Sequence, residues 1–355
     1  PFIDALFTAT SATCVTGLVT VSTAVHWSVF GKCVILLLIQ IGGLGFMSVA
    51  AIASFVLRRT ITLHERMVMS AGLNLSDGGG IVRLTRRVLF GTFIIEGTGA
   101  VLLSCRFVPH YGFPKGITMG VFHAVSAFCN AGFDLMGTPD DPFQSLIGWA
   151  EDPLVNITVM ALIVLGGLGF FVWSDVWDKH SFRRLRLHTK IVLTATAGLL
   201  LFGFGWTLLF EWSNPATLGA FDTPHKLLAA AFESVTLRTA GFNTIDLGAL
   251  TGPSQAVSCL LMFIGGSPGS TAGGIKTVTA AVLVLTAISA FCGRTTVSAF
   301  GRTIAPRSIM NAVTLLMAGG VLSAPVRSPE SRTHRFTSAC LKRSPRSARS
   351  VCPWV

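Results

Sequence analysis

Long apolar runs are the feature that most restricts how this 355-residue chain can fold. Each run exceeds the roughly 18 apolar residues that a helix needs to cross a bilayer. The runs cover residues 27–57, 88–108, 153–177, 191–210 and 256–291. With 51% hydrophobic and 12% charged residues, the chain has too little polar surface for a water-soluble protein of this length. We therefore predict an all-α membrane protein that contacts the lipid bilayer.

The charged residues between the runs predict which side of the membrane each loop faces. Residues 58–87 and 178–190 are rich in Arg and Lys, which places both loops in the cytoplasm by the positive-inside rule. Residues 134–152 contain five acidic residues and no Lys or Arg, so this segment is predicted to face outward and to attract cations. The net charge of +11 therefore reflects topology, and we predict no nucleic-acid partner.

Three segments repeat one pattern, which reads FTATSATCVTGL at 7–18, FHAVSAFCNAGF at 122–133 and FESVTLRTAGF at 232–242. Each starts with an aromatic residue and continues as a short apolar helix, expected to be about nine or ten residues long, to a glycine. These glycines, Gly17, Gly132 and Gly241, recur at intervals of 115 and 109 residues. Such a period indicates repeated structural units.

The repeated segments are too short to cross a bilayer, so each is predicted to enter the membrane and return to the same face. Non-helical backbone at membrane depth is tolerated only where it lines a water-filled path or lies inside protein. Glycine permits positive φ, which lets successive carbonyl oxygens point the same way. Rings of such carbonyls can replace the hydration shell of potassium.

Each repeated segment is followed by an apolar run with a glycine-rich interruption. IGGLGF at 41–46 and LGGLGF at 165–170 are predicted to be small-residue helix contacts. IGGSPGSTAGGIKT at 264–277 differs, because Pro268 removes a hydrogen-bond donor and five glycines weaken the helix. We predict an unwound intramembrane loop there.

The TCVTG, FCNAG and RTAGF strings, together with GGSPGSTAGGIK, resemble the Trk/Ktr/HKT potassium transporters over about residues 1–323. The resemblance implies repeated units of a first helix (M1), a pore helix and a second helix (M2), in a pseudo-fourfold arrangement around one ion pore. It also implies a gate at the broken helix of the third unit. A homodimer in the plasma membrane, with filters facing outside and a cytoplasmic nucleotide-binding regulatory ring, would be expected.

The resemblance assigns functional positions residue by residue. Potassium would bind the backbone carbonyls of an ion filter formed by Thr13, Cys14, Val15, Thr16, Gly17, Cys129, Asn130, Ala131, Gly132, Arg238, Thr239, Ala240 and Gly241. The gate loop would comprise Gly265, Gly266, Ser267, Gly269, Ser270, Thr271, Gly273, Gly274 and Lys276. No covalently bound cofactor, catalytic residue or other metal site is expected, and sodium is the alternative ion.

The expected organisation divides the chain into units and loops. These are 1–57 (pore helix, filter and M2 of unit 1), 58–83 (cytoplasmic loop), 84–177 (unit 2), 178–188 (cytoplasmic loop), 189–291 (unit 3, with the gate loop at 264–277), 292–324 (linker and start of unit 4) and 325–355 (basic tail). The first and fourth units are thus expected to be incomplete, and the natural N-terminus to precede residue 1.

The basic tail supplies +6 of the net charge and contains no filter-like string. The simplest interpretation of this composition is a solvated, disordered segment. However, DNA that encodes ACLKRSPRSARSVCPWV can encode LFEALSALGTVGLSVG in another frame, which repeats the filter pattern. We therefore expect residues after about Ala324 to be a frameshifted translation of the fourth unit, and the coding DNA tests this.

Four charged residues within or beside the predicted membrane segments have expected roles, and for two of them an alternative remains open. Lys276 could latch the gate loop or merely extend to the cytoplasmic interface. Glu96, inside a predicted span, is expected to bond a neighbouring helix, with ion coordination as the alternative. Glu233 and Arg238 are expected to brace the third pore helix.

The predicted function is potassium uptake, and no enzymatic activity is expected. Sodium-coupled potassium symport and a non-conducting membrane anchor for a cytoplasmic regulator remain the alternatives. Because each filter has one glycine and no TVGYG run, we expect few ion sites and imperfect discrimination between potassium and sodium.

Overall fold

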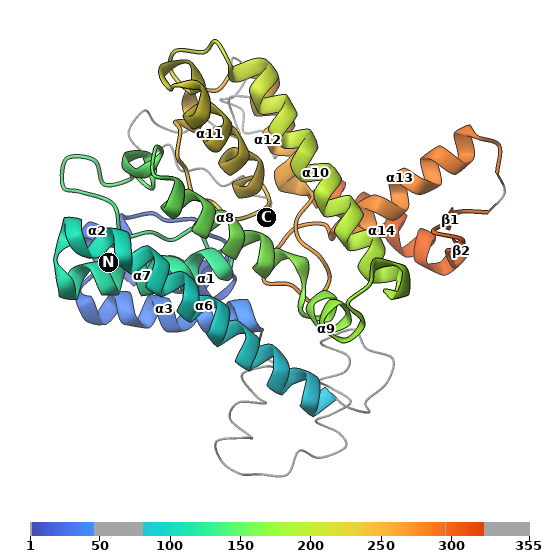
Figure 1. Cartoon of the computed structure of the whole chain (residues 1–355), viewed down its shortest axis with the longest axis horizontal. Coiled ribbons are helices and arrows are strands. Elements are labelled where there is room, and N and C mark those ends of the chain that lie inside the picture. The colour runs from blue at the N-terminus through green and yellow to red at the C-terminus, as the bar shows by residue number, and fades with distance from the viewer. Residues whose placement is uncertain (1, 46–80, 295, 323–355) are drawn as a thin grey trace.

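The computed structural model describes residues 2–45, 81–294 and 296–322, and most of these residues are helical (Figure 1). The predicted cytoplasmic segment around Arg58, Arg59 and Arg66 and the basic tail lie outside the described residues. In chain order the elements are α1 (Phe2–Thr13), α2 (Thr23–His26), α3 (Val29–Leu44), α6 (Ile81–Tyr111), α7 (Phe113–Phe128), η1 (Ile147–Trp149), α8 (Pro153–Leu168), α9 (Phe170–Lys179), η2 (Phe182–Arg184), α10 (Leu187–Glu211), η3 (Leu218–Ala220), α11 (Thr223–Thr236), η4 (Leu247–Ala249), α12 (Gly252–Phe263), α13 (Thr277–Phe291), β1 (Ser298–Ala299), β2 (Arg302–Thr303) and α14 (Pro306–Leu322).

Two helices of the described part, α6 and α10, are long and apolar enough to cross a membrane. They contain the runs predicted at 88–108 and 191–210. The run at 153–177 forms two helices, α8 and α9, which meet at an angle of 92° and together make either a broken span or a re-entrant segment. Gly169 between them has a φ of +91°, which few other residues adopt, and the next amide, Phe170 N, bonds Gly269 O instead of continuing the helix.

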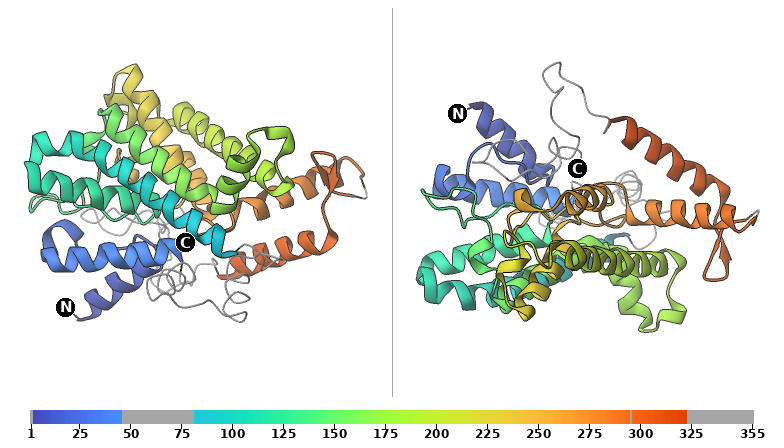
Figure 2. Two further views of the ribbon diagram at one scale, coloured as in Figure 1. Left: turned by 60° about the horizontal axis from the view of Figure 1, so that its bottom comes forward. Right: turned by 90° about the horizontal axis from the view of Figure 1, so that it is seen from above.

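The last apolar run is broken, as predicted. α12 ends at Phe263 and α13 begins at Thr277, so the backbone between them is not helical. α13 leads to a short antiparallel hairpin, β1–β2, and α14 then packs against α13 (Figure 2). This pair of helices extends away from the body of the molecule.

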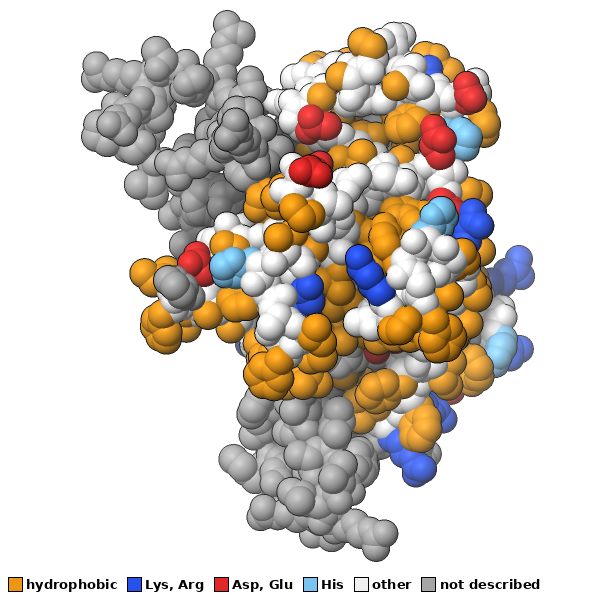
Figure 3. Space-filling model, turned by 90° about the vertical axis from the view of Figure 1, so that its left-hand side faces the viewer, with side chains coloured by type: hydrophobic (Ala, Val, Ile, Leu, Met, Phe, Trp, Pro, Cys, Tyr) orange, Lys and Arg blue, Asp and Glu red, His pale blue; other side chains and the backbone are white. Residues whose placement is uncertain are grey.

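Large apolar side chains are exposed on the outer surfaces of several helices. Phe30, Phe93, Leu201, Leu209 and Phe291 are between 57% and 92% exposed. Hydrophobic side chains also cover much of the face drawn in Figure 3. Such extensive apolar surface fits contact with lipid or with another protein subunit.

Three shorter helices, α1, α7 and α11, carry the repeated sequence pattern. They contain 12, 16 and 14 residues, so the predicted length of nine or ten residues was too short. The helices begin upstream of the aromatic residues that open the pattern, and Pro114 and Pro224 occupy the first turns of α7 and α11. At about 1.5 Å per residue they still reach at most about 24 Å, less than the roughly 30 Å hydrocarbon core of a bilayer.

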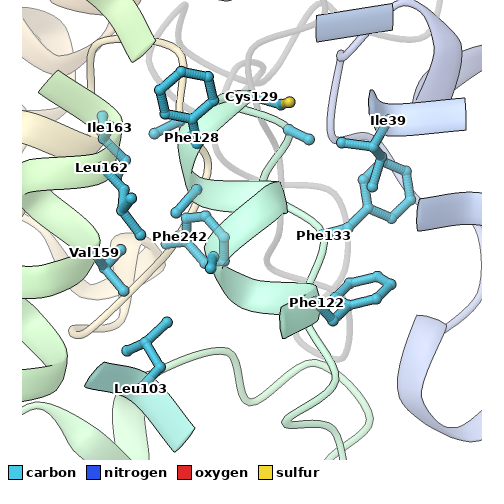
Figure 4. Packing of buried hydrophobic residues seen from close by; sticks show 14 of the residues in the cluster. Ile39, Leu103, Phe122, Phe128, Cys129, Phe133, Val159, Leu162, Ile163 and Phe242 are labelled. Atoms are coloured by element: carbon cyan, nitrogen blue, oxygen red, sulfur yellow. The ribbon is translucent and has the colours of Figure 1, made fainter. Parts of the chain in front are cut away.

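The main core lies where α7 meets its neighbours. Phe122, Phe128 and Phe133 are almost completely buried there, with Ile39 on one side and Phe242 on the other (Figure 4). α7 contacts α3, α6 and α8, and α8 in turn contacts α11. The core therefore joins residues from all three repeats, and the ends of the short helices are held inside it.

Glycines let the longer helices approach the ends of the short ones. A Cβ atom at Gly42 of α3 would collide with Thr13 O, and one at Gly166 of α8 would collide with Phe128 O. A Cβ atom at Gly43 would likewise collide with Cys129 Sγ of the following repeat. The predicted small-residue contacts of the IGGLGF and LGGLGF strings are therefore present.

We expect Gly166→Ala to destabilise the protein by about 1–3 kcal/mol, because the added methyl group must displace the backbone of Phe128. Thermal unfolding in detergent should show a midpoint several degrees lower. The matched control is Gly198→Ala in α10, where a Cβ would meet no atom within 4 Å. If both variants unfold at the same temperature, the close contact does not contribute to stability.

Candidate functional site

Three glycine-containing turns, one from each repeat, lie against one another. A Cβ at Gly17 would lie 2.6 Å from Ala131 O, and one at Gly132 would lie 2.7 Å from Ala240 O and 3.1 Å from the Cα of Gly241. All three glycines line one small hollow of about 20 Å³. Residues more than 100 positions apart in the chain therefore form one continuous row of backbone.

The backbone of these turns has the same conformation in all three repeats. The φ angles of Gly17, Gly132 and Gly241 are +78°, +69° and +85°. Two positions earlier, non-glycine residues also have positive φ, with values of +55° for Val15 and Asn130 and +65° for Thr239. Left-handed φ costs a non-glycine residue about 1–2 kcal/mol, so tertiary contacts must hold these turns. The repeated glycine was visible in the sequence, whereas the strained position before it was not.

Side chains of the short helices fix the segments that follow the turns. Ser126 Oγ donates to Phe133 O at 2.6 Å, and Thr236 Oγ1 donates to Phe242 O, also at 2.6 Å. In α7 the buried His123 has Nδ1 2.7 Å from Met119 O, and Leu135 N donates to its Nε2 at 3.3 Å. Sequence reasoning missed these roles. The only signal was a hydroxyl residue near the end of each short helix.

The three short helices end beside the glycine row. α1, α7 and α11 end at Thr13, Phe128 and Thr236, four or five residues before the respective glycines. The C-terminus of a helix carries a partial charge of about −0.5 from its aligned peptide dipoles. Asp134, 3% exposed, also lines the hollow. The electrostatic potential of these groups favours a cation.

The unwound segment after α12 forms a closed loop. Gly265 N donates to Ile275 O at 3.0 Å, Ile275 N donates to Phe263 O at 3.1 Å, and Thr277 N donates to Gly266 O at 3.0 Å. These bonds join the two ends of the loop. Gly265 permits the approach, since a Cβ there would collide with Gly273 O.

Arg238, in the third turn, bonds this loop. Its Nη2 donates to Gly265 O at 2.8 Å and to Thr277 Oγ1 at 3.0 Å. No ion pair joins Arg238 to Glu233 among the described residues, and the bracing role of these two residues stays a prediction. The guanidinium connects the third turn to both ends of the loop.

The middle of the loop reaches the second repeat. Thr271 Oγ1 donates to Phe128 O at 2.9 Å and accepts from Asn130 Nδ2 at 3.1 Å. Lys276 is half-buried, and its Nζ donates to Ala272 O at 2.8 Å, within the loop itself. The loop therefore touches the turns of two repeats, which the sequence did not reveal.

Glu96 of α6 bonds a neighbouring helix, which was the favoured expectation. Gln40 Nε2 of α3 donates to its two carboxylate oxygens at 3.0 and 3.2 Å. The thiol of Cys129 lies 3.9 Å from the same carboxylate. Glu96 therefore lies behind the second turn, where it connects α3, α6 and that turn.

The sequence of this chain is similar to those of known uptake proteins. The chain is 43% identical over 314 residues to the potassium/sodium uptake protein NtpJ of Enterococcus hirae, covering 88% of this chain and 68% of that protein. It is also 43% identical over 303 residues to Ktr system potassium uptake protein B of Bacillus subtilis, covering 85% and 67% respectively. The chain thus spans about two thirds of the length of these relatives.

The fold is shared with a solved structure. The crystal structure of the potassium transporter TrkH from Vibrio parahaemolyticus matches with a TM-score of 0.67 at 17% identity, over 91% of this chain and 64% of that one. The family model described as TrkH, cation transport protein, matches residues 1–325. Members of this family are multi-pass membrane transporters and not enzymes. The family match and the 43% identity show that this chain belongs to the TrkH family of cation transport proteins.

Proposed function

We propose that this protein takes up potassium through a path lined by backbone carbonyls at the Gly17, Gly132 and Gly241 turns. The observation that carries the proposal is the row of three positive-φ glycines at the C-terminal ends of three short helices. Carbonyl oxygens placed this way can substitute for the hydration of a monovalent cation. The helix ends add negative potential at the same place.

The names of the relatives support the choice of ion. The two proteins with 43% identity are named for potassium/sodium uptake and for potassium uptake. Backbone carbonyls carry only partial charge, so they suit a weakly hydrated monovalent ion better than an anion or a divalent cation. In this proposal the 134–152 segment faces outside and raises the local cation concentration.

The filter proposed here comprises the turns around residues 13–17, 129–132 and 238–241, with potassium bound by carbonyl oxygens alone. A pseudo-fourfold ring needs one further repeat, and residues 292–324 would lead into it. The 265–276 loop is the proposed gate, because it bonds the second and third turns directly. Movement of this loop would then change access to the path.

The partners belong to the same proposal. A homodimer would cover part of the exposed apolar surface formed by residues such as Phe30 and Phe291. A cytoplasmic nucleotide-binding ring is proposed as the regulator. Sodium-coupled potassium symport is the alternative mode, and a non-conducting anchor is the alternative without transport.

Rubidium uptake separates transport from anchoring. The full-length gene product, expressed in cells that lack their own potassium uptake systems, should restore growth at low potassium and accumulate rubidium. An anchor has no conduction path, so it would do neither. Repeating the uptake with and without sodium distinguishes simple conduction from sodium-coupled symport, in which uptake requires sodium.

Gly132→Ser should lower potassium uptake by about tenfold and reduce the potassium-to-sodium uptake ratio, because a side chain at positive φ costs about 1–2 kcal/mol and would press on Ala240 O. The matched control is Gly205→Ser in α10, where a Cβ would meet no atom within 4 Å. An unchanged ratio in Gly132→Ser would remove this turn from the filter.

A further inference from the structure

The proposed gate loop consists of two parts that bond different repeats. We call residues 263–266 together with 275–277 the neck, and residues 267–274 the tip. The neck contains both ends of the loop, and its bonds stay within the third repeat. The tip contacts the second repeat. This division determines which contacts must break if the loop moves.

The neck is closed by backbone pairing and by Arg238. Three backbone hydrogen bonds join its two segments, 263–266 and 275–277. The Thr277 hydroxyl donates to Gly265 O at 3.0 Å, and Arg238 Nη2 donates to both Gly265 O and Thr277 Oγ1. Thr277 is completely buried and Arg238 is 7% exposed. Charge-assisted bonds of this kind are stronger than neutral ones, so the neck is the firmer part.

The tip rests on the bend between α8 and α9. Ser267 N donates to Gly167 O at 3.0 Å, Thr271 N donates to Gly166 O at 3.3 Å, and Phe170 N donates to Gly269 O at 2.9 Å. The Thr271 hydroxyl adds the bonds to Phe128 O and Asn130 Nδ2. Thr271 is the tip side chain that bonds the second filter turn directly.

Several buried polar atoms at the tip have no hydrogen-bond partner in the described structure. They are Ser267 Oγ and Ser270 Oγ in the tip itself and Asn130 Oδ1 in the second filter turn, whose Nδ2 bonds the tip. A buried polar atom without a partner raises the free energy of the docked state, and exposure to water lowers that cost. At the neck, the Thr277 hydroxyl is satisfied, whereas Arg238 Nε and Nη1 also lack a partner in the described structure. Opening of the neck would also break the charge-assisted bonds of Arg238 to Gly265 O and Thr277 Oγ1, so undocking of the tip costs less.

We propose that the loop moves as a hinged flap, with the neck fixed to Arg238 and the Thr271 hydroxyl acting as the latch that holds the tip on the second filter turn. Opening breaks the bonds of Thr271 to Phe128 and Asn130 and leaves the neck intact. This inference rests on the proposed function for its consequence in transport. The hinge movement itself does not depend on what the protein transports.

Hydroxyl-removing variants of the full-length protein test the proposal. Thr271→Val should raise rubidium uptake by about five- to tenfold, the effect expected for loss of the latch bonds. Thr271→Ser retains a hydroxyl and should rescue the low uptake. Thr277→Val loosens the neck and should not raise uptake. The control is Thr286→Val in α13, whose hydroxyl bonds Val282 O of its own helix.

A labelling measurement tests the hinge without relying on conduction. Ser267→Cys introduces a thiol at a completely buried tip position, and its reaction with a small thiol reagent can be quantified on the peptide that contains residue 267. Thr271→Val should accelerate this labelling about five- to tenfold, whereas Thr277→Val should leave it unchanged. If Thr271→Val is not monodisperse in detergent, Thr271→Ala provides the same loss of the hydroxyl.

The outcomes separate the two proposals. Equal acceleration by Thr277→Val and Thr271→Val, or no acceleration by Thr271→Val, would overturn the hinge. Absence of rubidium uptake by the unsubstituted protein would count against the proposed function, and the labelling rates would still decide the hinge. Faster labelling in Thr271→Val, with slow labelling in Thr277→Val and in Thr286→Val, would support the flap.

Discussion

Non-helical backbone at membrane depth must either bond partners inside the protein or line a water-filled path, and this constraint organises the described structure. The chain leaves helical geometry at three glycine turns and again at the 264–276 segment. Close approach at Gly42 and Gly166 places α3 and α8 directly against the ends of the short helices. Amides of the loop then donate to Gly166 O and Gly167 O at the end of α8. The loop and the end of α8 therefore satisfy each other's backbone polar groups.

Electrostatics explains how a basic residue can lie next to a row of carbonyls proposed to bind cations. The Arg238 guanidinium is directed to Gly265 O and Thr277 Oγ1, both of which belong to the loop. Three helix C-termini and Asp134 surround the glycine row and supply negative potential. The positive charge therefore stabilises the neck of the loop, and the negative potential remains with the turns.

The packing around the second turn shows how the repeats depend on one another. Cys129 touches Gly43 of the first repeat, and its thiol lies near Glu96, which Gln40 holds in place. Asn130 bonds Thr271 of the third repeat. One four-residue turn is thus positioned by side chains from all three repeats, and a change in any of them would be transmitted to its carbonyls.

Sequence alone determined the helical class, the two long spans, the repeated glycines and the break at Pro268, because apolar length, glycine and proline act on local backbone. It did not determine the 92° bend at Gly169, the upstream starts of the short helices or the positive φ of Val15, Asn130 and Thr239. The partners of Arg238 and Thr271 were equally invisible. These features depend on contacts between residues far apart in the chain, and only the tertiary structure brings those residues together.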